Sequence, residues 1–264
     1  MTLGLVPVDA AGAGWPTAPA CWEEAMSVSV RDRIGAATGT AFVALILIGN
    51  PMTNAGPAHN TGSAGEQLLR DAAYQASSVG VAAGLVLELL GFAAFICFLG
   101  YLADVLRRAA GGRPGSLAAG AAIVSGAVML AVKLGSGAPV LALWADHGHI
   151  GPQLALVLND LASVTFVISW LPFAVFVAAA AAALHRVNLV GRPTAYAGLL
   201  LGVSGVALSV IGAHDPLGAN PLAFLLGLLW VLVVSVRLAV RPGVGAGAGE
   251  AIGQTVDAGV VISA

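Results

Sequence analysis

Long runs of apolar residues alternate with short polar segments along most of the chain. Six of these runs reach the length of about 20 residues that a helix needs to cross the ~30 Å hydrocarbon core of a membrane. They lie at approximately 34–52, 78–103, 117–143, 153–184, 195–213 and 221–240. The pattern predicts an all-α, polytopic membrane protein built as a bundle of six transmembrane helices.

The two ends of the chain differ from this central region. Residues 1–30 and 243–264 are rich in Ala, Gly and Pro and show no hydrophobic periodicity, which is typical of disordered tails. Met26 is a plausible start codon, so the residues before it are a candidate for a misassigned start. Residues 31–242 are expected to form a single transmembrane domain.

Composition agrees with a membrane protein. The chain is 58% hydrophobic and only 9% charged, with a mean hydropathy of +0.93, whereas a soluble domain carries about 25% charged residues. The expected surrounding is therefore a lipid bilayer, and no nucleic-acid partner is expected; the net charge of −2 is uninformative, because the placement of charge matters here and not its sum.

The basic residues predict the topology, because Lys and Arg concentrate in cytoplasmic loops. Of the 11 Lys and Arg residues, nine fall on one side of a six-span arrangement. These nine are Arg31, Arg33, Arg107, Arg108, Arg113, Arg186, Arg192, Arg237 and Arg241. We therefore expect a bacterial inner-membrane protein with both termini in the cytoplasm.

Small residues recur at a spacing that suits close helix packing. Lipid tails are as apolar as leucine, so membrane helices associate partly by close approach of their backbones at small residues. The candidate pairs are Gly35 with Gly39, Gly80 with Gly84, and Gly198 with Gly202. The sequence also suggests an internal repeat, because Gly112-Arg113-Pro114 followed by Val124-Ser125-Gly126 recurs as Gly191-Arg192-Pro193 followed by Val203-Ser204-Gly205.

Three ionisable residues interrupt the apolar spans: Glu88, Lys133 and Asp160. Such groups cost about 2.5–3.5 kcal/mol each on insertion scales, so they are expected to face the bundle interior and to find partners there. Asn159 and Ser163 lie close to Asp160 on the same helix and extend the expected buried polar cluster. We hypothesise that Glu88 and Lys133 form an ion pair and that Asp160 is the group that titrates.

Several functions fit this cluster. It could line a small polar cavity of a proton-linked transporter or of a small-ligand binding module, with a small solute or a proton as partner. It could equally serve as a clasp that fixes helix register in a non-catalytic scaffold or assembly partner. The oligomeric state is left open by the sequence.

Histidines near the predicted outer face suggest a third function, that of a metal-dependent membrane enzyme. His147, His149, His214 and Asp215 could together ligate a divalent metal. The H-x-H spacing lacks the i,i+4 geometry of a helical zinc site, so solvated loop residues are the simpler interpretation. No phosphate loop, nucleophile elbow or other catalytic motif is present, and we predict no catalytic residues and no cofactor.

Three short features carry a family resemblance. Arg33-Ile34-Gly35 opens the first span, an acid lies in mid-span within residues 85–90, and Gly191-Arg192-Pro193 leads into a Gly-rich span. In these features, over about residues 30–242, the chain resembles multi-span bacterial membrane proteins classified as domains of unknown function. The resemblance implies a six-helix bundle and no particular activity.

Overall fold

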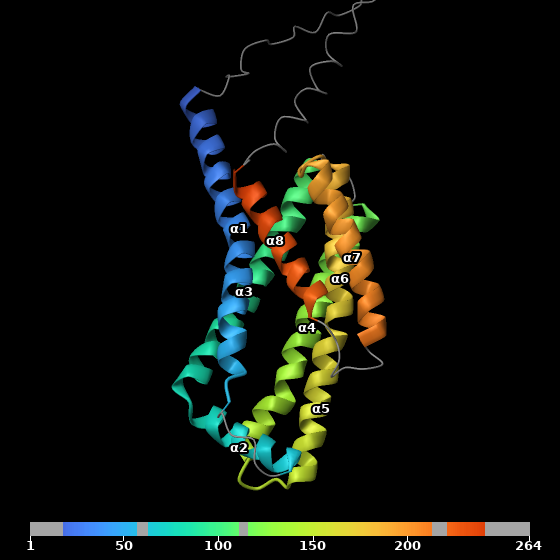
Figure 1. Cartoon of the computed structure of the whole chain (residues 1–264). Helices are drawn as coiled ribbons and strands as arrows, with labels where there is room; N and C mark the ends of the chain where they lie inside the picture. Colours follow the sequence, from blue (N-terminus) through green and yellow to red (C-terminus); the bar gives the residue numbers. More distant parts are fainter. Residues whose placement is uncertain (1–17, 57–62, 111–115, 213–220, 241–264) are drawn as a thin grey trace, which may run out of the picture.

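The computed structural model describes residues 18–56, 63–110, 116–212 and 221–240 (Figure 1). All regular structure in these ranges is helical, which confirms the all-α prediction. The helices are α1 (Ala18–Thr53), α2 (Ala64–Ser77), α3 (Val79–Ala109), α4 (Leu117–Asp146), α5 (Pro152–Ile168), α6 (Trp170–Arg186), α7 (Arg192–Gly212) and α8 (Leu222–Val240).

Six segments of this structure are long and apolar enough to span a membrane, in agreement with the predicted number. They are Val30–Thr53, Val79–Ala109, Leu117–Asp146, Pro152–Arg186, Arg192–Val210 and Leu222–Val240. The chain is therefore a multi-pass membrane protein. We call the end of the bundle where α1 enters and α8 leaves the terminal end, and the opposite end the α2 end (Figure 1).

The amino-terminal boundary differs from the prediction. The helix α1 begins at Ala18, so residues 18–30 are helical and do not belong to an irregular tail. Five of the seven residues 20–26 are Ala, Glu or Met, which favour a helix. Residues 1–17 and the predicted tail 243–264 lie outside the described residues, and so does the first Gly-Arg-Pro element of the suggested repeat, which stays a prediction.

The helix α2 was not predicted, because its 14 residues are too short and too polar to register as a span. A capping box starts it: the Ser63 hydroxyl accepts from the Glu66 backbone N–H, and the Glu66 carboxylate accepts from the Ser63 N–H at 2.9 Å. Gly65 packs directly on Pro152 at the start of α5. The helix therefore packs on the bundle at the end opposite to that where α1 enters and α8 leaves (Figure 1).

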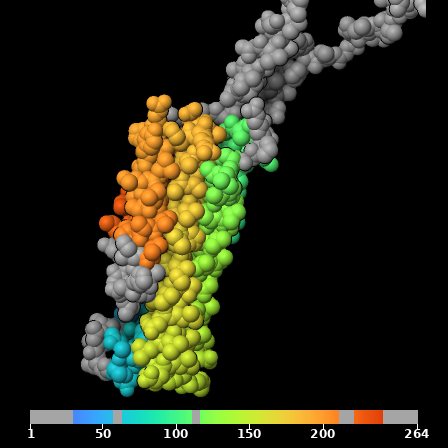
Figure 2. Space-filling view, turned by 90° about the vertical axis from the view of Figure 1, so that its right-hand side faces the viewer, coloured from blue at the N-terminus to red at the C-terminus, as the bar shows by residue number. Residues whose placement is uncertain are grey.

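The fourth span is divided at Ser169, where α5 ends and α6 begins. Pro172 lies three residues beyond the break and has no N–H to donate to the carbonyl of Ile168, so the regular hydrogen-bond ladder cannot continue. Figure 2 shows α5 and α6 following one another as one column between α4 and α7, so the two helices together form a single span.

In two helix pairs, a glycine of one helix lies so close to its partner helix that no side chain fits between them. A Cβ added to Gly84 of α3 would lie 2.7 Å from the Cβ of Met52 and 3.0 Å from the carbonyl oxygen of Gly49, both in α1. A Cβ on Gly202 of α7 would lie 2.5 Å from the Cβ of Ala178 in α6. Gly84 and Gly202 of the predicted pairs thus mark the α1–α3 and α6–α7 contacts, whereas Gly80 is exposed and, among the described residues, has only Ser78 of its own chain segment nearby.

A cluster of buried phenylalanine side chains fills the bundle toward its terminal end. Phe95 is fully buried and its ring lies 4.5 Å from that of Phe42 and 5.4 Å from that of Phe176. Leu99 of α3 packs on Gly126 of α4 in the same region. Toward the α2 end, α3 and α4 move apart (Figure 1), and the space between the helices opens into a cavity.

Candidate functional site

A cavity of about 650 Å³ lies in the α2 half of the bundle. This volume falls within the range of about 300–1,000 Å³ that is common for small-molecule sites. The cavity is lined by residues of α1, α3, α4 and α5, by Trp170 at the start of α6 and by Pro221 just before α8. Its polar lining residues are Asn50, Thr53, Asn54, Glu88, Lys133, Ser136, Asn159 and Ser163.

Glu88 brings the acid to this cavity from α3. Its Oε1 accepts a hydrogen bond of 2.8 Å from the hydroxyl of Thr53, which lies at the last residue of α1. Gly49 lets α1 approach α3 at this level, because an added Cβ there would lie 2.9 Å from Cγ of Glu88. The carboxylate is thus held on one side and faces the cavity on the other.

Lys133 brings the base from α4. Its Nζ lies 3.2 Å from the centre of the Phe166 ring of α5, a cation–π contact. An aromatic face offers partial compensation for a desolvated ammonium group, but it accepts no ordinary hydrogen bond. The three N–H groups of the ammonium are therefore incompletely satisfied by the protein.

The predicted ion pair between Glu88 and Lys133 is not formed. Within the described residues, every contact of 4.0 Å or less between a basic group and a carboxylate involves Asp32 or Asp104 at the terminal end. Glu88 and Lys133 share one cavity but lack direct contact. The physical reason is the separation of α3 and α4 at this level, which leaves room between the two side chains.

Asp160 lies outside the cavity, contrary to the prediction. It is exposed on the outer face of α5, with Val157 and Leu161 also exposed beside it. Asn159 and Ser163 do line the cavity, as expected. Successive helical residues are about 100° apart, so the rotation of α5 that turns Asn159 inward turns its neighbour outward. The cavity therefore contains one acid and one base, not two acids.

A hydrogen-bonded bridge through Gln75 spans the α2 end of the bundle. The Gln75 amide nitrogen donates to the carbonyl of Ala55 at 3.1 Å, and its amide oxygen accepts from Nε1 of Trp144 at 2.8 Å. Trp144 itself lines the cavity. One side chain thus joins the residues after α1 to the end of α4 across this end.

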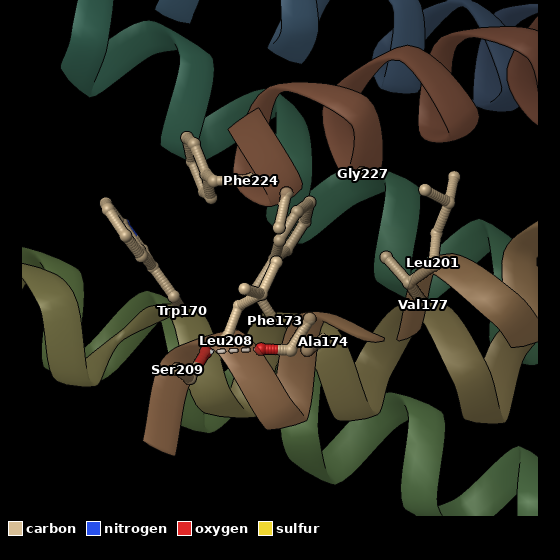
Figure 3. Close-up of a pocket in the computed structure, with 11 residues that line it drawn as sticks. Trp170, Phe173, Ala174, Val177, Leu201, Leu208, Ser209, Phe224 and Gly227 are labelled. Carbon is tan, nitrogen blue, oxygen red and sulfur yellow. Dashed lines mark hydrogen bonds between the residues drawn. The ribbon is translucent and has the colours of Figure 1, made fainter. Parts of the chain in front are cut away.

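Trp170 separates the large cavity from a much smaller one between α6, α7 and α8 (Figure 3). Its ring stacks on Phe224 with centroids 6.2 Å apart, and Phe224 lies 5.0 Å from Phe173. The smaller pocket holds about 10 Å³, roughly the space for one water molecule. Of these two cavities in the described part of the chain, the larger is therefore the candidate ligand site.

Several residues of this site were missed from sequence: Asn50, Thr53, Trp144 and Phe166 line it, and Gln75 accepts a hydrogen bond from Trp144. Asn50, Thr53 and Asn54 share one face at the end of the first span, and that polar face was an available signal. The aromatic residues gave none, because aromatic side chains at helix ends and in spans are expected without any ligand.

Only part of the predicted outer-face metal site lies within the described residues. His214 and Asp215 lie outside the described residues. In the ranges that are described, no three His, Cys, Asp or Glu side chains gather as metal ligands. His147 lies 2.7 Å, through Nδ1, from the carbonyl oxygen of Trp144 at the end of its own helix. His149 follows in the turn after α4.

Fold and cavity together define the class of this molecule: a multi-pass helical membrane protein with a charged cavity within one half of its spans. No family model matches the chain, and no curated protein and no solved structure shows significant similarity to it. The functional argument therefore rests on the cavity itself.

Proposed function

We propose that this protein binds a small ligand in the cavity of its α2 half and moves it across the membrane in a proton-linked step. The observation that carries the proposal is the pair of unlike charges, Glu88 and Lys133, which line one cavity without contacting each other. Charged groups within a membrane protein are costly unless paired, so two that stay apart favour a ligand between them.

The placement of basic residues supports an orientation with the terminal end in the cytoplasm. The cavity would then face the outer half of a bacterial inner membrane. The aromatic core around Phe95 would close the path to the cytoplasm, and transport would require this core to separate. Glu88 is the carboxyl that could take up a proton when the ligand leaves.

The first test measures proton flux into proteoliposomes that contain a pH-sensitive dye, with a total extract of bacterial cells as the ligand source. We expect the extract to increase proton flux for the wild type and not for Glu88→Gln. Asp160→Asn is the matched control, because it removes a mid-span carboxyl outside the cavity. Equal flux in Glu88→Gln and the wild type would contradict the role of Glu88.

The same extract tests where the ligand binds. Gly137 lines the cavity and Gly135 does not, and at both positions an added Cβ meets nothing within 4 Å. Gly137→Leu should therefore fill the cavity without disturbing the helix, and Gly135→Leu should leave the cavity open. We expect the extract to raise the thermal unfolding temperature of Gly135→Leu and not of Gly137→Leu. Equal shifts would place the ligand elsewhere.

A further inference from the structure

Part of the cavity lining is apolar and half-exposed. Leu89 of α3 and Leu134 and Leu141 of α4 all line the cavity, and 45–49% of each residue is exposed. Gln75 bridges the α2 end, and the phenylalanine core fills the space toward the terminal end. These leucines thus mark one edge of the cavity, at the gap between α3 and α4 (Figure 1).

The two charges retain unused hydrogen-bonding capacity. Glu88 accepts one hydrogen bond, from Thr53, whereas a carboxylate has about four acceptor positions. Lys133 contacts the Phe166 ring, and its ammonium group has three donors. A ligand that presents an anionic oxygen to Lys133 and an N–H donor to Glu88 would satisfy both groups in a low-dielectric site, where charge-assisted hydrogen bonds are strong.

We propose that the cavity receives the headgroup of an ethanolamine-type phospholipid, which enters between α3 and α4 with its acyl chains left in the bilayer. Its phosphate would pair with Lys133 and its primary ammonium with Glu88. This inference rests on the proposed function and names the class of ligand. A choline headgroup fits less well, because its trimethylated nitrogen has no N–H to donate to the carboxylate. A free zwitterion would satisfy the charges but would gain nothing from the half-exposed leucines.

The test uses phosphatidylethanolamine labelled with a fluorophore on its acyl chain, so that the amine stays free. Binding to the purified full chain in detergent micelles is measured by fluorescence anisotropy. We expect Glu88→Gln and Lys133→Met each to weaken binding at least tenfold, and Asp160→Asn to change it less than twofold. Unlabelled phosphatidylethanolamine should displace the probe at least ten times more effectively than phosphatidylcholine.

Two further arms separate the alternatives. Soluble phosphoethanolamine that displaced the probe as well as the lipid does would overturn the lipid part of the proposal, and equal displacement by phosphatidylcholine would overturn the role of the ammonium. Gly137→Leu against Gly135→Leu repeats the test without removing a charge, so loss of binding in the first alone supports the site. Extract-driven proton flux without phosphatidylethanolamine binding would refute this inference and leave the proposed function intact.

Discussion

The ion pair between Asp32 and Arg108 offers a quantitative test of how the terminal end is held together. The two side chains are joined by hydrogen bonds of 2.6 and 3.3 Å, with the guanidinium contacting both carboxylate oxygens. Asp32 exposes only 7% of its side chain and Arg108 exposes 33%. The pair connects α1 to α3, 76 residues apart in sequence.

The magnitude follows from this geometry. Removing one partner of a fully buried ion pair costs about 3–5 kcal/mol. Here the guanidinium is one-third exposed, and its Nε still lies 3.2 Å from Asp104, so Asp32→Asn is expected to cost less, about 2 kcal/mol. Arg108→Gln should cost about 3 kcal/mol, because it leaves the buried carboxylate of Asp32 without a basic partner.

The assay is reversible unfolding in mixed micelles of a mild detergent and dodecyl sulfate, followed by circular dichroism. The double variant should be about 1–2 kcal/mol more stable than the sum of the single effects predicts, since both members of one interaction are removed. Arg107→Gln is the control: its side chain is 74% exposed and contacts only Asp104, so a cost below about 0.5 kcal/mol is expected. A coupling near zero, or an Asp32→Asn variant as stable as this control, would refute the reasoning.

Two other expectations concern backbone contact and helix capping. Gly202→Ala should destabilise the protein by about 1–3 kcal/mol, since the added Cβ would lie 2.6 Å from the backbone nitrogen of Ala178. Gly120→Ala should stabilise it by up to ~1 kcal/mol in the same unfolding assay, because an added Cβ there meets nothing within 4 Å. Hydrogen bonds from Ser63 lower the pKa of Glu66 below its ordinary 4.5, so its stabilisation of α2 is present above pH 4.5 and fades as pH falls through the lowered value. Amide protection in α2 should show this loss in the wild type, and a Glu66→Gln variant with the same loss would contradict it.

The transmembrane architecture was largely predictable because each span is determined by its own local composition. Glu88 and Lys133 were also expected to face a common interior, and both line the cavity. The predicted ion pair between them is absent. The sequence could not show this, because the contact depends on the distance between α3 and α4. Asp160 was placed wrongly for a similar reason: packing sets the rotation of α5, and one residue of rotation moves a side chain from cavity to exterior.

Shorter features were missed for a different physical reason. The helix α2 is amphipathic and lies outside the apolar spans, so hydropathy does not reveal it. The Ser63-x-x-Glu66 capping box was a readable signal of its start. The contact between Asp32 and Arg108 gave no such signal, because it joins residues far apart in the chain.

The interruption at Ser169 has a mechanical consequence. A helix that lacks a backbone hydrogen bond near Pro172 bends there more readily than an intact one. On one side of the break, α6 is locked to α7 through Gly202, while on the other side α5 carries Asn159, Ser163 and Phe166. A swing of α5 about this joint would carry α2 with it, because Gly65 of α2 packs on Pro152, and would widen or narrow the chamber.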